Sequence, residues 1–469
     1  MTCFANYGQS KREKKQQSMN DCLIRYYRCP EHYARLALRG PLSETNGFFR
    51  LGPDTVCYGK CSGHSPADSP NGILRDALQD TTIDGNTIHL PFDLRQVVEN
   101  LRYELYSGEH TNGNGLKAQA LTKAYYLIRP LLPVGVRKHI QKWRLRGWDQ
   151  LPFPQWPVDR TVDQIFEQVM LLSLRSQSAD RVPFIWFWPD GANSCAIMTH
   201  DVETAMGRDS CAHLMDMDDA SGIKAAFEIV PEQRYEVTSD FLKSIRQRGF
   251  EIVVHDLNHD GRLFSNREQF LERVASIHAY KEQFGSIGFR AAVLYRKQSW
   301  FNDLNFDYDM SVPNVAHLDP QRGGCCTVMP YFVGKILELP VTTTQDYTLF
   351  HILNDYSINL WKTQMDLIME KHGLISFIVH PDYIGGDRER KVYEALLNHL
   401  AHLRQERALW ITTPGEVNRW WRQRAEMKLV EDRHGLRIEG DGNERARIAY
   451  ASENNGRIAY AVETPACVS

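Results

Sequence analysis

Six side chains that could carry acid–base or metal chemistry follow short apolar segments between residues 196 and 380 of this 469-residue sequence. They comprise two carboxylates, three imidazoles and one guanidinium: Asp201, Glu203, His255, His259, Arg290 and His380. Two imidazoles and a carboxylate can bind a divalent metal ion and leave positions open for water and a carbonyl oxygen. The remaining carboxylate and imidazole can then serve as general base and general acid. The set therefore indicates metal-assisted hydrolysis.

The spacing of these residues supports their acting together. Asp201 and Glu203 are two positions apart, so in extended backbone they point to the same side. His255 and His259 are four positions apart, which places both imidazoles on one side of a helical turn. Taken singly, each of these residues is more often structural than catalytic. Because all of them follow expected apolar strands, the functional interpretation is stronger for the set than for any single residue.

The elements that must position these side chains alternate between apolar strands and amphipathic helices. We expect strands at residues 196–198, 223–230, 251–254, 287–293, 335–341, 374–379 and 409–412. We expect helices at 161–176, 239–249, 267–285, 357–372, 388–404 and from residue 414. This alternation predicts a parallel sheet covered by helices, either a barrel or a doubly wound sheet. In such folds the chemistry lies at the C-terminal ends of the strands.

Four motifs in this order resemble those of a known family. They are Thr-His-Asp-Val-Glu at 199–203, His-Asp-Leu-Asn-His at 255–259, Phe-Arg at 289–290 and His-Pro at 380–381. The pattern is similar to that of the polysaccharide deacetylases, carbohydrate esterase family four with the NodB-homology domain. The resemblance covers residues 190–425. It implies an α/β fold, a distorted (β/α) barrel of NodB type, with a divalent metal, most often zinc, that removes N-acetyl or O-acetyl groups from a saccharide.

The resemblance also implies a role for each motif residue. Asp201 corresponds to the catalytic base, Arg290 to the arginine that pairs with it, and His380 to the acid that protonates the leaving group. The metal ligands would be Glu203, His255 and His259. The family's third motif has Pro and Tyr after the arginine, whereas this chain has Ala291, Ala292 and Val293. The backbone N–H of Val293 could still stabilise the oxyanion, because that role needs no side chain.

Three further positions do not follow the family's motifs clearly. The acidic residue of the family's fourth motif has no clear counterpart, and Glu338 and Asp346 are both candidates. Glu203 stands where the family usually has Asp, which changes the reach of that ligand. His200 replaces an aromatic residue found in some members, and no role follows for it from the sequence.

The pattern divides the chain into five parts. They are a disordered N-terminus at 1–19, an α+β domain at 20–125, a basic helix with a Pro-rich linker at 126–160, the deacetylase-like domain at 161–425 and a β-hairpin appendix at 426–469. The α+β domain includes an amphipathic helix starting near Asp93 and suggests no chemistry. Residues 134–148 carry an apolar stripe with basic flanks, which favours either peripheral contact with an anionic membrane or packing on the next domain.

Composition and charge indicate which partners and which cellular location to expect. The formal net charge of −3 gives no global reason to expect nucleic acid as a partner. Irregularly spaced cysteines and the lack of an apolar leader predict a cytoplasmic protein with reduced thiols. Cys57 and Cys61 are better interpreted as structural thiols than as a metal pair. An intracellular location favours a nucleotide-linked or lipid-linked polysaccharide intermediate as the substrate.

Other functions remain compatible with the same residues. A NodB-like domain that has lost catalysis could bind a saccharide without hydrolysing it, and the departures at Glu203 and Ala292 keep this alternative open. Hydrolysis of a small non-sugar amide on the same fold is a third hypothesis. Non-haem iron oxygenases share the ligand set, but they are expected on an all-β fold. Metal content together with acetate release separates the deacetylase hypothesis from saccharide binding without hydrolysis.

Overall fold

The computed structural model describes residues 19–107, 145, 147–433 and 435–463. The expected disordered N-terminus and almost all of the expected basic helix at 134–148 lie outside the described residues. The chain forms two compact units. Unit 1 comprises Met1–Tyr106, Arg160–Ala192 and Trp420–Ser469, and unit 2 comprises Ser107–Asp159 and Asn193–Arg419. Residues 160–192 thus group with both chain ends, which the sequence pattern did not predict.

In its described residues, unit 1 is an α+β assembly of small sheets and helices, and it includes the C-terminal end of α11 (Pro414–Glu426). Its other α-helices are residues 19–27, α2 (Leu94–Arg102) and α5 (Thr161–Gln177). One sheet has the order β1-β5-β4 and another the order β19-β18-β6, while β2 with β3 and β16 with β17 form antiparallel pairs. The strands are β1 (Leu36–Leu38), β2 (Gly47–Arg50), β3 (Val56–Gly59), β4 (Thr82–Asp84), β5 (Thr87–Leu90), β6 (Arg181–Ile185), β16 (Lys428–Asp432), β17 (Gly435–Glu439), β18 (Ile448–Asn454) and β19 (Arg457–Val462).

The core of unit 1 ties its three chain segments together. β18 pairs antiparallel with both β19 and β6, so the C-terminal hairpin is part of a sheet. The buried Arg424 donates hydrogen bonds to the carbonyl oxygens of Tyr26, Ile185 and Trp186. Tyr26 belongs to the first segment of unit 1, Ile185 and Trp186 to the second, and Arg424 to the third. The side chain of Arg424 therefore links all three segments. Cys57 and Cys61 are buried free thiols in the same unit.

Unit 2 is built on a largely parallel sheet. The strand order is β12-β13-β11-β10-β9-β8-β7-β14, with β15 also paired to β7. β12 and β13 pair antiparallel, whereas the other pairs of this sheet are parallel. The strands are β7 (Ser194–Val202), β8 (Ala226–Ile229), β9 (Glu251–His255), β10 (Gly288–Arg290), β11 (Tyr308–Asp309), β12 (Tyr331–Val333), β13 (Ile336–Glu338), β14 (Leu374–Ile378) and β15 (Leu409–Thr412).

The sheet curves towards a barrel that closes through irregular backbone. The N–H of Thr343, which follows β13, donates to the carbonyl oxygen of Ser376 in β14 at 3.3 Å. The hydroxyl groups of Thr342 and Thr343 donate to carbonyl oxygens of the same strand. Unit 2 is therefore an α/β barrel-like fold with one distorted seam, in line with the expected fold class.

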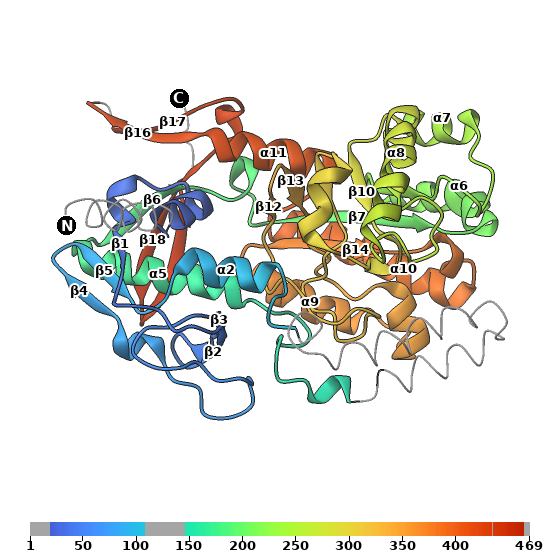
Figure 1. The fold of residues 1–469 in the computed structure, drawn as a ribbon. Helices are drawn as coiled ribbons and strands as arrows, with labels where there is room; N and C mark the ends of the chain where they lie inside the picture. The colour runs from blue at the N-terminus through green and yellow to red at the C-terminus, as the bar shows by residue number, and fades with distance from the viewer. Residues whose placement is uncertain (1–18, 108–144, 146, 434, 464–469) are drawn as a thin grey trace. The chain divides into compact units, whose positions relative to one another are not determined.

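Helices cover the outside of this sheet (Figure 1). They are α6 (Ala205–Ala220), α7 (Ser239–Gln247), α8 (Arg267–Phe284), α9 (Asn359–Met369), α10 (Asp387–Glu406) and α11 (Pro414–Glu426), and the unit boundary falls within α11. Side chains of Thr204, Thr238 and Asn266 accept backbone N–H groups at the starts of α6, α7 and α8. Such caps replace the missing intrahelical partners of the first turn.

Short helical turns complete the described part of unit 2, and two of them, η6 and η9, follow shortly after β10 and β14. The turns are η4 (Trp148–Gln150), η6 (Ala292–Leu294), η7 (Gln298–Leu304), the π-helix η8 (Thr348–Ile352) and η9 (Pro381–Tyr383). The strands β7, β8, β9, β10 and β14 are buried along almost their whole length. Among the described residues, no helix is long and apolar enough to cross a membrane.

Candidate active site

The six side chains singled out by the sequence meet at one edge of the unit 2 sheet. Asp201 lies in β7, and Glu203 follows that strand directly. His255 ends β9 and Arg290 ends β10, while His380 comes two residues after β14. Because parallel strands place their carboxyl ends at the same edge, residues up to 179 positions apart converge there. The convergence follows from the parallel direction of the strands, and His259 joins the group through the loop after β9.

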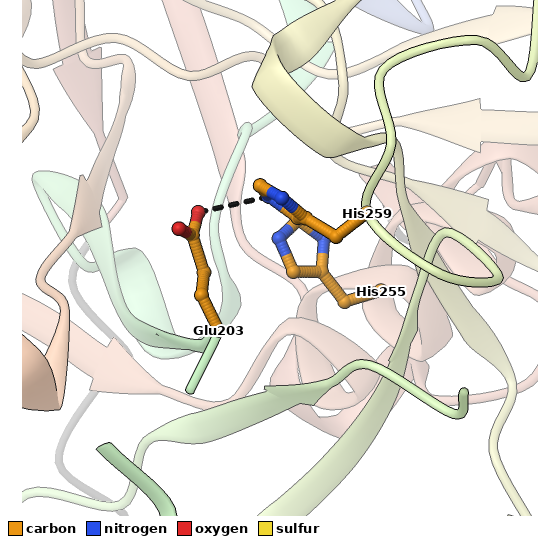
Figure 2. A group of neighbouring side chains, drawn as sticks. All are labelled: Glu203, His255 and His259. Atoms are coloured by element: carbon orange, nitrogen blue, oxygen red, sulfur yellow. Dashed lines mark ion pairs between the residues drawn. The ribbon is translucent and has the colours of Figure 1, made fainter. Parts of the chain in front are cut away.

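Glu203, His255 and His259 form a group that could hold a metal ion (Figure 2). One donor atom from each of the three residues lies within 4.8 Å of the others. Oε1 of Glu203 is 2.9 Å from Nε2 of His259, and the two imidazole rings have their centroids 4.8 Å apart. His259 has a φ of 55°, so the loop after β9 turns back and brings this second imidazole to the first.

The hydrogen bonding of His255 favours a metal ligand. Its Nδ1 lies 3.1 Å from the carbonyl oxygen of Arg290, which can only accept, so Nδ1 carries the proton. Nε2 then presents a lone pair, and this buried atom has no hydrogen-bond partner among the described residues. A histidine that donates one N–H to a backbone carbonyl and points the other nitrogen inwards is the usual arrangement of a metal-ligating imidazole. The residues present therefore fit a divalent metal ion.

A second group of three donors overlaps the first but fits a metal less well. Asp201, Glu203 and His380 also bring donor atoms within 4.8 Å. Burial lowers the pKa of His380, but the charges of Asp346 and Glu203 raise it. The carboxylates have the larger effect, so the pKa lies well above its usual value. His255 differs, because burial lowers its pKa to about 4 despite Asp201 nearby. Glu203 also raises the pKa of His259 against the effect of burial, and metal binding there would release the proton.

Asp201 is paired with Arg290 inside the protein. Nη1 of Arg290 donates to Oδ1 of Asp201 at 2.5 Å, and the same nitrogen donates to the hydroxyl of Thr199 at 2.8 Å. Burial would raise the pKa of Asp201, but Arg290, His255 and His380 outweigh it and lower the pKa below its ordinary value. Asp201 is thus held as an oriented carboxylate.

A second carboxyl group beside Arg290 was not predicted from the sequence. Oε1 of Glu228, in β8, lies 3.7 Å from Nη1 of Arg290, and the side chain is fully buried. Burial raises the pKa of Glu228 well above its ordinary value, against the charge of Arg290 and together with that of Asp201. One arginine thus faces two carboxyl groups whose pKa values are shifted in opposite directions. No polar motif marks Glu228, because it lies inside the apolar strand 226–229.

The structure decides between the two acidic candidates for the fourth motif. Oδ1 of Asp346 lies 2.6 Å from Nδ1 of His380, and its Oδ2 accepts the backbone N–H of His380 at 2.7 Å. Glu338 instead accepts the N–H of Val312 at 2.9 Å and interacts with Asp309. Asp346 therefore fixes the ring of His380, while Glu338 lies in a separate buried carboxyl pair.

The backbone at Val293 is in an unusual conformation. Val293 has a φ of 60° and Leu294 a φ of 53°, although non-glycine residues seldom adopt the left-handed region and β-branched ones such as valine least of all. The preceding amides are held in place, since Ala291 donates to the hydroxyl of Ser311 and Ala292 to a carboxylate oxygen of Asp256. Such strain costs about 1–3 kcal/mol and persists only where surrounding contacts impose it. This loop carries the proposed oxyanion donor.

Aromatic rings and one arginine lie beside these groups. The rings of Tyr347, His351 and Tyr383 have centroids within 5.1–5.6 Å of one another, and that of His380 lies 5.0 Å from Tyr383. Nε of the exposed Arg234 donates to the carbonyl oxygen of Glu203 at 2.9 Å. His351 lies in the π-helix η8 and Tyr383 ends the short turn η9. Neither follows the periodicity of a strand or a long helix, so the sequence carried no signal for them.

Comparisons with known proteins give likenesses to solved structures. No family model matches this chain. No curated protein matches it either. A presumed polysaccharide deacetylase from Mycobacterium smegmatis is 18% identical, with 51% of this chain and 93% of that chain covered and a TM-score of 0.42. The allantoinase PuuE is 14% identical, covering 50% and 92% at a TM-score of 0.38. The peptidoglycan deacetylase PdaC from Bacillus subtilis is 11% identical, covering 50% and 95% at a TM-score of 0.33.

Proposed function

We propose that this protein is a metal-dependent hydrolase that removes acetyl groups from an N-acetylated or O-acetylated saccharide. The observation that carries the proposal is the arrangement around Glu203. Glu203 belongs to two groups: one includes His255 and His259, which complete a ligand set, and the other includes Asp201 and His380, an oriented carboxylate and an imidazole with a raised pKa. Zinc is the proposed metal, because two imidazoles and a carboxylate with open positions suit its catalytic sites.

The residues of the chain divide the reaction between them. Asp201, held by Arg290, takes a proton from the attacking water. His380, held by Asp346, gives a proton to the departing nitrogen or oxygen. The backbone N–H of Val293 donates to the oxygen of the acyl group as charge develops there. A bound divalent ion would supply Lewis-acid polarisation of the acyl carbonyl and a lowered pKa for water.

Two measurements test this proposal together. Purified protein should contain about one divalent metal ion per chain, and it should release acetate from at least one member of a panel of acetylated sugars. Allantoin and simple N-acetyl amides belong in the panel as non-saccharide substrates. Metal binding without acetate release from any sugar would contradict the proposed activity and favour saccharide binding alone. Hydrolysis confined to the non-sugar amides would contradict the substrate class.

The pH profile should depend on Asp346. Because this carboxylate raises the pKa of His380 against the effect of burial, the acid form survives to high pH in the wild-type protein. Asp346→Asn should lower that pKa, so the high-pH limb of kcat should move to lower pH by about one unit or more, equivalent to about 1.4 kcal/mol per unit.

Asp355→Asn is the matched control for this shift. Asp355 lies shortly after η8 and accepts the backbone N–H of Ser357 at 2.9 Å. Removing its charge should leave the high-pH limb in place. An unchanged limb in Asp346→Asn would show that His380 does not set it.

A further inference from the structure

A second buried polar cluster lies behind the candidate site in unit 2. It consists of His200 in β7, Asp218 in α6 and Tyr393 in α10, all with no exposed surface. Nε2 of His200 lies 3.0 Å from Oδ2 of Asp218, and the hydroxyl group of Tyr393 donates to the other oxygen of that carboxylate. The proposed reaction uses none of these three side chains.

The other ring nitrogen of His200 reaches the neighbouring strand segment. Nδ1 lies 3.0 Å from the carbonyl oxygen of Val379, the residue before His380. A carbonyl oxygen only accepts, so Nδ1 donates in this bond. Because His200 also directly precedes Asp201, one imidazole ring connects the backbone next to the proposed base with the backbone next to the proposed acid.

Backbone pairing alone stops short of the two reacting groups. The register of β7 with β14 ends at Thr199 and Ile378, after which Val379 donates its N–H to the carbonyl oxygen of Thr199 at 3.0 Å. The ring of His200 provides the next link across the two segments. Its own orientation is set from outside the sheet by Asp218, so two helices hold the ring in place.

We propose that His200, oriented by Asp218 and Tyr393, is a positioning residue that sets the separation of Asp201 and His380. This inference rests on the proposed hydrolase function, in which those two residues must face one substrate from opposite sides. Displacement of a reacting group by about 1 Å can lower a rate by about 100-fold. Loss of a residue that orients a reacting group therefore lowers turnover while leaving substrate binding in place.

The chain offers a matched control at the opposite end of the same two strands. Nδ1 of His372, just before β14, lies 2.8 Å from Oδ1 of Asn193, just before β7. His200 and His372 are thus both largely buried imidazoles that connect β7 to β14, one at the C-terminal end and one at the N-terminal end. A purely structural role predicts similar consequences for the two. A positioning role predicts a difference in turnover.

The experiment compares His200→Asn with His372→Asn in the full-length, metal-loaded protein. Both variants should lower the midpoint of thermal unfolding. At matched metal content and well below that midpoint, His200→Asn should reduce kcat by about 10- to 100-fold with KM nearly unchanged. His372→Asn should keep the wild-type kcat. Equal kcat values for the two variants would overturn the proposal.

Tyr393→Phe provides a second arm that removes a single hydroxyl group from a buried aromatic side chain. It should lower kcat by a smaller factor, and combining it with His200→Asn should add no further loss, because both act through one ring. Independent, multiplicative losses would overturn the proposal. Absence of acetate release from the wild-type protein would instead contradict the proposed function, so the two failures are distinguishable.

Discussion

Asp201→Asn should lower turnover by roughly 10²- to 10⁴-fold while the protein keeps its metal ion, because the change removes basicity and preserves side-chain shape. In the wild-type protein Arg290 holds this carboxylate ionised against the effect of burial. Asparagine can still accept the hydrogen bond from Arg290 through its amide oxygen. Acetate release at saturating substrate and metal content per chain are the two measurements.

Glu228→Gln is the matched control for this prediction. Glu228 is a second buried carboxyl group beside Arg290, and its pKa is raised well above the ordinary value. Because burial disfavours the charged form of this side chain, the neutral amide should change turnover little. Glu203→Gln should instead weaken metal binding, with partial recovery of activity on addition of zinc. If Asp201→Asn loses metal and Glu203→Gln retains it, the two carboxylates have been assigned in the wrong order.

His255→Ala should remove both the metal ion and the activity while leaving the protein folded. The variant loses the buried nitrogen that has no hydrogen-bond partner in the described structure. Substitution of groups that merely support a ligand costs about 10- to 100-fold in metal affinity, so loss of a ligand itself should cost more. Metal titration followed by thermal unfolding measures the affinity and the fold separately.

His278→Ala serves as the control for His255→Ala. His278 lies in α8, and its Nε2 is 2.9 Å from the carbonyl oxygen of Leu304, so it has an imidazole–carbonyl contact like that of His255. This variant should keep the metal ion and most of the activity. Stoichiometric metal in purified His255→Ala would refute the ligand assignment.

The sequence by itself determined where the reactive groups stand relative to strands and helices. A strand end is marked locally, where an apolar run gives way to polar residues. The expected strand at 409–412 matches β15, and the expected strand at 251–254 is one residue shorter than β9. Capping by Thr238 and Asn266 is also a local interaction. Since the strands are parallel, the ends converge, and the six residues could be grouped without knowing the strand order.

Only the tertiary structure determined which side chains contact the candidate catalytic residues. Asp346 and Glu338 were equivalent in the sequence, yet only Asp346 contacts His380, across 34 positions. The pairing of His200 with Val379 spans 179 positions. The raised pKa of Glu228 likewise depends on its burial, which outweighs the charge of Arg290. Contacts and burial of this kind arise when distant segments pack, so no local pattern encodes them, whereas strand ends and helix caps are set by adjacent residues.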